Sequence, residues 1–135
     1  MSEPLPDVPA LEISAAHALA RLQATLSFAD TGPGASTIAL YDANEQLLVT
    51  LTLTKPCGQI TEAGYLVLTQ ASGGGDMILN SGQAAIGVWA TGDGQLIGRG
   101  LVTDEAGAGH FKLLGSTGTQ LYAGGKAILG ETRIA

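Results

Sequence analysis

The chain has 135 residues, enough to bury one hydrophobic core but not two, and its 45% hydrophobic content excludes disorder over most of its length. The net charge of −6, with six Lys and Arg scattered along the chain, argues against nucleic-acid binding, because neutralising phosphates requires clustered cations. A single cysteine, Cys57, excludes an internal disulfide framework and a cysteine-based zinc site.

Charged residues make up only 13% of the chain, about half of the roughly 25% that is usual in globular proteins. Two explanations are open. Uncharged polar residues and glycine cover much of the outside, or other subunits cover part of it.

The first ten residues contain Pro4, Pro6 and Pro9 together with acidic residues, which predicts an extended arm over 1–13. Leu11 and Ile13 supply apolar side chains at the end of this arm. We expect the arm to dock on another subunit, where it can cover a sheet edge. It has no basic segment followed by an apolar run, as a secretory signal would, and no stretch has the 18 apolar residues of a membrane span.

The segment 14–30 has the period of a helix. Leu19, Leu22 and Leu26 recur at i, i+3 and i+7, so they share one helix face. Ser14 is a suitable N-terminal cap, and the glycine- and proline-containing run 30–34 ends the pattern.

After residue 34 the period becomes that of strands. Strands are predicted at 37–41 and 46–54, joined by a turn at 42–45, and the second strand is predicted to end at 55–58. Alternation in the second strand places Leu48 and the threonines outside and four residues inside, namely Leu47, Val49, Leu51 and Leu53.

Glycine-containing turns divide the rest of the chain into short apolar runs. The spacing predicts further strands at 64–70 and near 76–80, 84–90, 95–103, 110–114, 119–123 and 126–134. Regular turns with no intervening helix predict a mainly β fold, an antiparallel β-sandwich or jelly-roll-like barrel over 35–135 with one N-terminal α-helix.

The sequence contains no assembled set of catalytic residues. His17 and His110 could act as bases, but neither belongs to a motif with a nucleophile. Cys57 is interpreted as a small buried residue, and no glycine-rich segment matches a phosphate-binding loop. We therefore expect no enzymatic activity and no cofactor.

The remaining candidates have structural interpretations. The run 91–94 around Asp93 is typical of a hairpin turn, and Trp89 is interpreted as a core anchor rather than a binding hot spot. A metal site at Asp104 and Glu105 is the weaker alternative to a turn there, because the segment lacks the calcium-loop pattern.

From about Ala20 to its end the chain resembles a family of small uncharacterised structural proteins of tailed bacteriophages and prophages. The segments that carry the resemblance are Ala20-Arg21-Leu22-Gln23, Ala29-Asp30-Thr31-Gly32-Pro33-Gly34, Ile38-Ala39-Leu40-Tyr41, Leu53-Thr54-Lys55-Pro56-Cys57-Gly58, Val102-Thr103-Asp104-Glu105-Ala106-Gly107 and Gly118-Thr119-Gln120-Leu121-Tyr122-Ala123-Gly124-Gly125. These are helix-end and turn signatures, and the family supplies no active-site residues.

The resemblance implies a virion component made in the bacterial host cytoplasm. Our first hypothesis is a structural adaptor in the tail-tip, baseplate or fibre-attachment region, with other virion proteins and copies of itself as partners. A capsid decoration protein is the alternative within this class. A carbohydrate-binding β-sandwich module is the alternative from another class, although it needs exposed aromatic residues and the chain has few.

Overall fold

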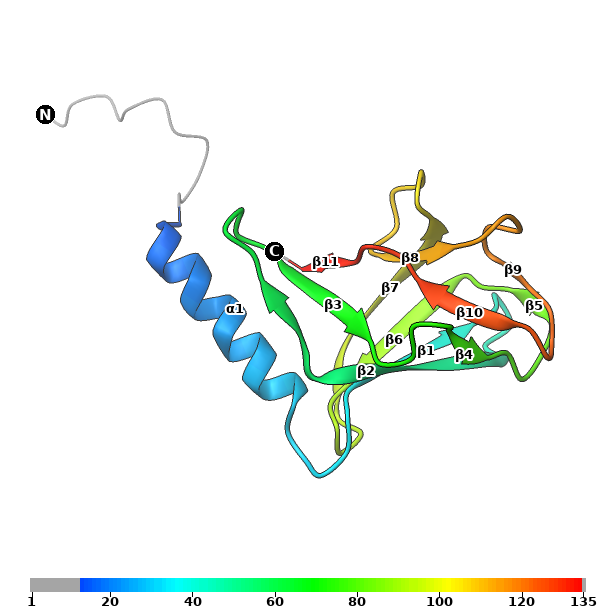
Figure 1. Cartoon of the computed structure of the whole chain (residues 1–135), viewed down its shortest axis with the longest axis horizontal. Coiled ribbons are helices and arrows are strands. Elements are labelled where there is room, and N and C mark those ends of the chain that lie inside the picture. Colours follow the sequence, from blue (N-terminus) through cyan, green and yellow to red (C-terminus); the bar gives the residue numbers. More distant parts are fainter. Residues whose placement is uncertain (1–12, 135) are drawn as a thin grey trace, which may run out of the picture.

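The structure, a computed structural model, describes residues 13–134 and consists of one helix and eleven strands (Figure 1). The elements are α1 (Ala15–Ala29), β1 (Thr37–Tyr41), β2 (Leu47–Ile60), β3 (Leu66–Gln70), β4 (Asp76–Met77), β5 (Gly82–Gln83), β6 (Ile86–Ala90), β7 (Leu96–Asp104), β8 (Phe111–Leu114), β9 (Gln120–Leu121), β10 (Lys126–Leu129) and β11 (Arg133–Ile134). The predicted mainly β fold with one N-terminal helix is confirmed.

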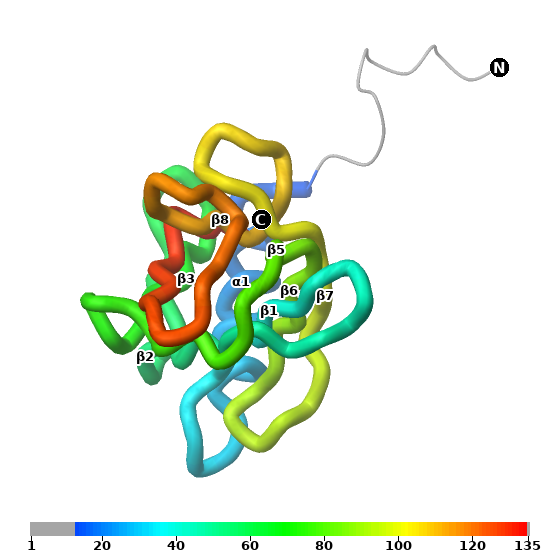
Figure 2. The backbone as a smooth tube through the Cα atoms, turned by 90° about the vertical axis from the view of Figure 1, so that its right-hand side faces the viewer, coloured from blue at the N-terminus to red at the C-terminus, as the bar shows by residue number. Residues whose placement is uncertain are grey.

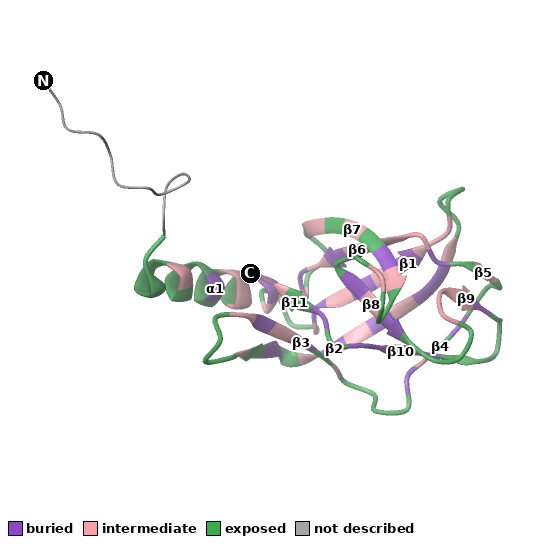
Figure 3. Ribbon diagram, turned by 90° about the horizontal axis from the view of Figure 1, so that it is seen from above, coloured by how far each residue is buried: buried purple, intermediate pink, exposed green. Residues whose placement is uncertain are grey.

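The helix α1 begins and ends where its capping residues predict. The Ser14 hydroxyl accepts the backbone N–H of His17, 3.2 Å away, and so satisfies one of the unpaired donors of the first turn. Only the second half of α1 packs on the barrel: Leu22 is buried, whereas Leu19 is 44% exposed. The first half projects beyond the strands (Figures 1 and 3).

Nine strands form one sheet in the order β11-β3-β2-β1-β6-β7-β8-β10-β4, and β5 pairs with β9 separately. Every pair is antiparallel except β7 and β8, which run parallel, so the predicted fully antiparallel arrangement is wrong at this point. The glycine-rich connection 105–110 resembles a hairpin turn in sequence. The connection instead carries the chain back so that β8 runs parallel to β7. The Asp104 carboxylate stabilises the turn at its start by accepting the N–H groups of Ala106 and Gly107.

The last predicted strand, 126–134, is two strands that together close the sheet. β10 pairs with β8 and β11 pairs with β3, so this one segment joins strands from the two sides of the sheet. Between β3 and β10 the Gln70 side chain takes the place of a backbone ladder: its amide donates to the Ala127 carbonyl and to the Asp76 carboxylate of β4, and its oxygen accepts the N–H of Leu129. Seen from the β5 end, the chain winds round the core with α1 behind it (Figure 2).

The predicted alternation in β2 is wrong at its start. Leu48 is fully buried and Leu47 is partly exposed, the reverse of the expectation, whereas Val49, Leu51 and Leu53 are buried as predicted. The cause is a register shift: Leu40 pairs with Val49 but Tyr41 pairs with Leu47. The extra residue in this β-bulge turns Leu48 inward.

The predicted end of this strand at 55–58 is also wrong, because β2 continues to Ile60 through an irregular stretch. Gly58 is a close-approach glycine and not a turn residue: a Cβ there would lie 2.1 Å from the carbonyl oxygen of Val67 on β3. The Asp30 carboxylate after α1 accepts the N–H of Cys57, which fixes the bend against the helix end.

The core is aliphatic, as the low aromatic content predicts. It is filled from all the long strands and by Leu22 and Ala29 of α1, with Trp89 and Phe111 as its large aromatic members. The Trp89 indole donates to the Ser36 hydroxyl, 2.8 Å away, so its one polar atom is satisfied. Trp89 is 4% exposed, which confirms the prediction of a core anchor.

Replacing Gln70 with Met tests the closure of the barrel. Gln70→Met keeps the side-chain length but leaves the partly buried N–H of Leu129 and the Ala127 carbonyl without partners, so the free energy of unfolding should fall by about 2–3 kcal/mol. Gln59→Met, at an exposed position of β2, is the control and should change it by less than about 0.5 kcal/mol. Denaturant unfolding measures both, and equal effects would contradict the assigned role.

Candidate interaction surfaces

Four of the five residues proposed for partner binding, Pro4, Pro6, Pro9 and Leu11, lie outside the described residues. The fifth, Ile13, is 39% exposed and directly precedes the projecting end of α1. Its position is compatible with a contact to another molecule.

The candidate catalytic side chains are dispersed. His17 is exposed on α1, and His110 is exposed immediately before β8. Cys57 is fully buried, as predicted, and its pKa is raised to about 12, first by burial and then by the nearby Asp30 carboxylate. A thiol of this kind is protonated at neutral pH and is a poor nucleophile.

The carboxylates considered for metal binding stabilise backbone turns. Asp93 lies in the β6–β7 hairpin, where its side chain bonds to the Thr91 hydroxyl, and Gly94 has a φ of 92°, as expected for the predicted turn. Asp104 caps the 105–110 connection as described above. Within residues 13–134 no three His, Cys, Asp or Glu side chains form a group that could hold a metal ion.

One face of the sheet has very little charge. Strand register and burial agree on which residues of β2, β1, β6 and β7 lie on the outside of the sheet. We call these twelve residues the outer face: Leu47, Thr50, Thr52, Thr37, Ala39, Tyr41, Ile86, Val88, Ala90, Leu96, Arg99 and Leu101. Arg99 is the one charged residue among them. Leu96 and Leu101 are 55% and 65% exposed, so the face presents apolar area that the described chain does not cover.

The inner side of β7 contains a gap in the packing. Gly87 and Gly100 make room for the Phe111 ring, since a Cβ on Gly87 would lie 2.6 Å from it. Gly98 pairs with Trp89 and so faces the same side of the sheet, yet a Cβ there would meet no atom within 4 Å. The space is therefore filled next to Gly87 and open next to Gly98.

This unfilled space is a cavity of ≈ 310 Å³ that we call the Trp89 slot. It is lined by Thr25, Trp89, Ile97, Gly98, Arg99, His110, Phe111 and Ile134. The slot lies where the barrel wall is incomplete: β8 pairs with β7 only from Val102 onward, and β11 pairs with β3. Among the described residues, Leu96–Gly100 of β7 thus have β6 as their one strand partner.

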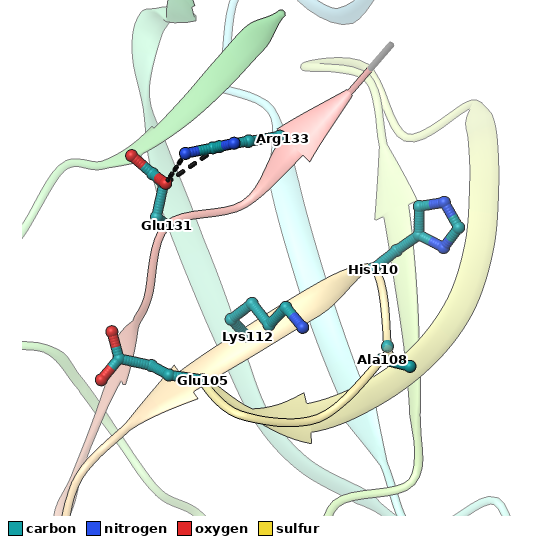
Figure 4. A pocket seen from close by; sticks show the side chains of 7 residues that line it. Glu105, Ala108, His110, Lys112, Glu131 and Arg133 are labelled. Carbon is teal, nitrogen blue, oxygen red and sulfur yellow. Dashed lines mark hydrogen bonds and ion pairs between the residues drawn. The ribbon is translucent and has the colours of Figure 1, made fainter.

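A second pocket, of ≈ 350 Å³, adjoins the slot at His110 and is shown in Figure 4. Its charged side chains are Glu105, Lys112, Glu131 and Arg133. They are largely committed to each other or to the backbone: Arg133 lies 2.7 Å from Glu131, and the Lys112 ammonium donates to the Gly107 carbonyl. Arg99 forms no ion pair within the described part of the chain, so it is an available cation at the slot.

No family model, curated protein or solved structure matches the chain. The described helix is too short and too polar to cross a membrane. The resemblance to phage structural proteins therefore stays a prediction.

Neither the slot nor the outer face is among the features predicted from the sequence. The outer face could have been predicted in part. The apolar residues at 86, 88 and 101 stand next in sequence to buried residues, so they lie on the opposite side of their strands. The slot has no signal in the sequence, since Gly98 resembles the glycines that pack against Phe111.

Cys57 should resist modification by a thiol reagent in the native protein at pH 8 and react once the chain is unfolded. Because its pKa is higher in the folded protein than the usual 9.0, ionisation favours the unfolded state as the pH rises from 9 to about 12. Over that window the wild type should lose stability relative to Cys57→Ala, by up to about 1.4 kcal/mol per pH unit. Rapid labelling of the folded chain would contradict burial.

Alanine substitutions at two glycines test the packing gap. Gly87→Ala should destabilise the protein by about 1–3 kcal/mol because its Cβ overlaps the Phe111 ring. Gly98→Ala should be neutral or stabilising by up to about 1 kcal/mol, since it adds a methyl group to open space. Thermal unfolding of both variants makes the comparison, and a large loss at Gly98 would mean that the slot is filled.

Proposed function

We propose that this protein is a non-enzymatic structural component of a tailed-phage particle, an adaptor in the tail-tip, baseplate or fibre-attachment region. It acts by packing against copies of itself and other virion proteins. The observation that carries the proposal is the outer face, on which one residue in twelve is charged and which includes the exposed Leu96 and Leu101.

The chemistry of this face fits a lasting contact. The cores of protein interfaces are depleted in charge and rich in apolar groups, and a stable interface buries roughly 800 Å² on each partner. A four-stranded face with threonine on β2 and aliphatic residues on β6 and β7 offers such a surface without mobile charged side chains. A contact surface of this kind would also explain why the chain as a whole carries so few charged residues.

The exposed aromatic residues support this function over a carbohydrate-binding module. Phe28 and Tyr122 are 43% and 57% exposed, but they lie on α1 and beside β9, at opposite ends of the molecule (Figure 1). A sugar platform requires aromatic rings gathered on one surface. The same outer face would also serve a capsid decoration protein, and location in the particle distinguishes the two.

The test of the function is whether the chain is part of the particle. Phage particles that encode it, purified after induction, should contain the protein in a fixed copy number by quantitative mass spectrometry. Antibody labelling in electron micrographs should mark the tail end. Labelling of the capsid would favour the decoration protein, and absence from purified particles would reject both.

A charge placed on the outer face should prevent assembly. Val88→Lys puts a second cation beside Arg99 at a partly exposed position, so folding should be kept while incorporation into particles falls at least about tenfold. Gln59→Lys adds the same charge at an exposed position of β2 outside this face and should be incorporated normally. Equal incorporation of the two variants would remove the outer face from the proposal.

A further inference from the structure

We propose that the Trp89 slot receives the N-terminal segment 1–12 of a second copy of the chain. This inference rests on the proposed function and deepens it, because it assigns the acceptor site for the arm. The segment would complete the barrel wall between β7 and β11, where no described strand lies.

The slot offers both parts of a strand-acceptor site. Leu96–Gly100 of β7 is a sheet edge with one strand partner, so its outward backbone groups are available to an extended chain. Beside that edge, the open space at Gly98 is bounded by Trp89, Phe111 and Ile134. An inserted aliphatic side chain would gain burial there without displacing any atom of the barrel.

The sequence of the segment matches this site. In a paired strand, alternate residues direct their N–H groups to the partner. Pro4 and Pro6 share one parity, so the N–H groups of Leu5 and Asp7 remain free to pair with β7 while these two prolines occupy the outer positions, where no donor is needed; Pro9 has the other parity and ends the pairing. Of the residues with the parity of Leu5 that precede Pro9, Leu5 is the aliphatic one, and we assign it to the space at Gly98, with Glu3 and Asp7 on the same strand face at the rim of the slot.

The charges are complementary as well. Residues 1–12 contain Glu3, Asp7 and Glu12 and no Lys or Arg. The available cation at the slot is Arg99, and the neighbouring Glu105 and Glu131 lie in the adjoining pocket, where Arg133 pairs with Glu131. Rim charges of this kind steer an acidic segment and fix its register more than they add affinity.

The choice of a second copy follows from the proposed function, in which copies of the chain pack against each other. The segment begins at the end of α1 that projects beyond the strands (Figure 3). Thr25 of α1 lines the slot, and Ser14 precedes it by eleven residues, about 16 Å of helix. The arm therefore joins the described chain about 16 Å along the helix from the part of α1 that lines the slot, and the dilution experiment below distinguishes docking on a second copy from docking within one chain.

Trp89 is the one tryptophan of the chain, so its fluorescence reports on the slot. The full chain, diluted from tens of micromolar to nanomolar, should show a concentration-dependent shift of tryptophan emission that coincides with dissociation in sedimentation velocity. If the wild-type emission does not change on dilution and Leu5→Asp shifts it at every concentration, the arm docks within its own chain and the proposal is wrong.

Filling the slot should block the arm. Gly98→Leu occupies the open space and should raise the dissociation constant about tenfold or more. Gly73→Leu, at an exposed loop glycine that also has no neighbour within 4 Å, is the matched control and should behave as wild type. Leu5→Asp should weaken association as Gly98→Leu does, and it changes no residue of the barrel.

The outcomes separate the two proposals. If Gly98→Leu and Leu5→Asp associate as tightly as wild type while Val88→Lys does not, the arm is not the contact and this inference is wrong, although the outer face stands. If the protein is absent from phage particles but Leu5→Asp and Gly98→Leu both abolish self-association, the proposed function fails and the arm exchange stands.

Discussion

The fold depends on the closure of its sheet at Gln70. A sheet with β11 at one end and β4 at the other has open edges, and the segment 126–134 removes most of them by pairing with β8 and then with β3. Ala127 and Leu129 of β10 pair with β4 and β8, but the Ala127 carbonyl and the Leu129 N–H face the Gln70 side chain of β3. One side-chain amide is the partner of both groups and also holds Asp76, which accepts the N–H of Thr52.

Because a side chain closes the barrel, its two ends differ in how completely their strands are paired. Where Gln70 acts, β3, β4 and β10 are drawn together around one polar group. At the other end of the wall β7 and β8 are joined over three residue pairs only, and the first half of β7 diverges from any second strand. The packing gap at Gly98 lies there. The same irregular closure thus gives the molecule a stable body and an unfinished edge.

The outer face and the unfinished edge are adjacent and share Arg99. A molecule with few charges needs its apolar faces covered, and a symmetric assembly covers them with further copies. In the proposed assembly the outer face supplies the area of contact and the arm supplies a directional link between neighbours. Buried Cys57 and the turn-forming Asp93 and Asp104 belong to this scaffold.

The sequence by itself determined the class of the fold, the helix with its Ser14 cap, the turns at 42–45 and 91–94, and the burial of Cys57 and Trp89. The fold class, the helix and the turns follow from local periodicity, capping and turn chemistry, which act over a few residues, and the two burials follow from residue type. Only the tertiary structure decided the inward turn of Leu48, the parallel pairing of β7 and β8, the division of 126–134 and the space beside Gly98. Those features depend on which strands become neighbours, and contacts between residues distant in the chain leave no pattern within any one segment.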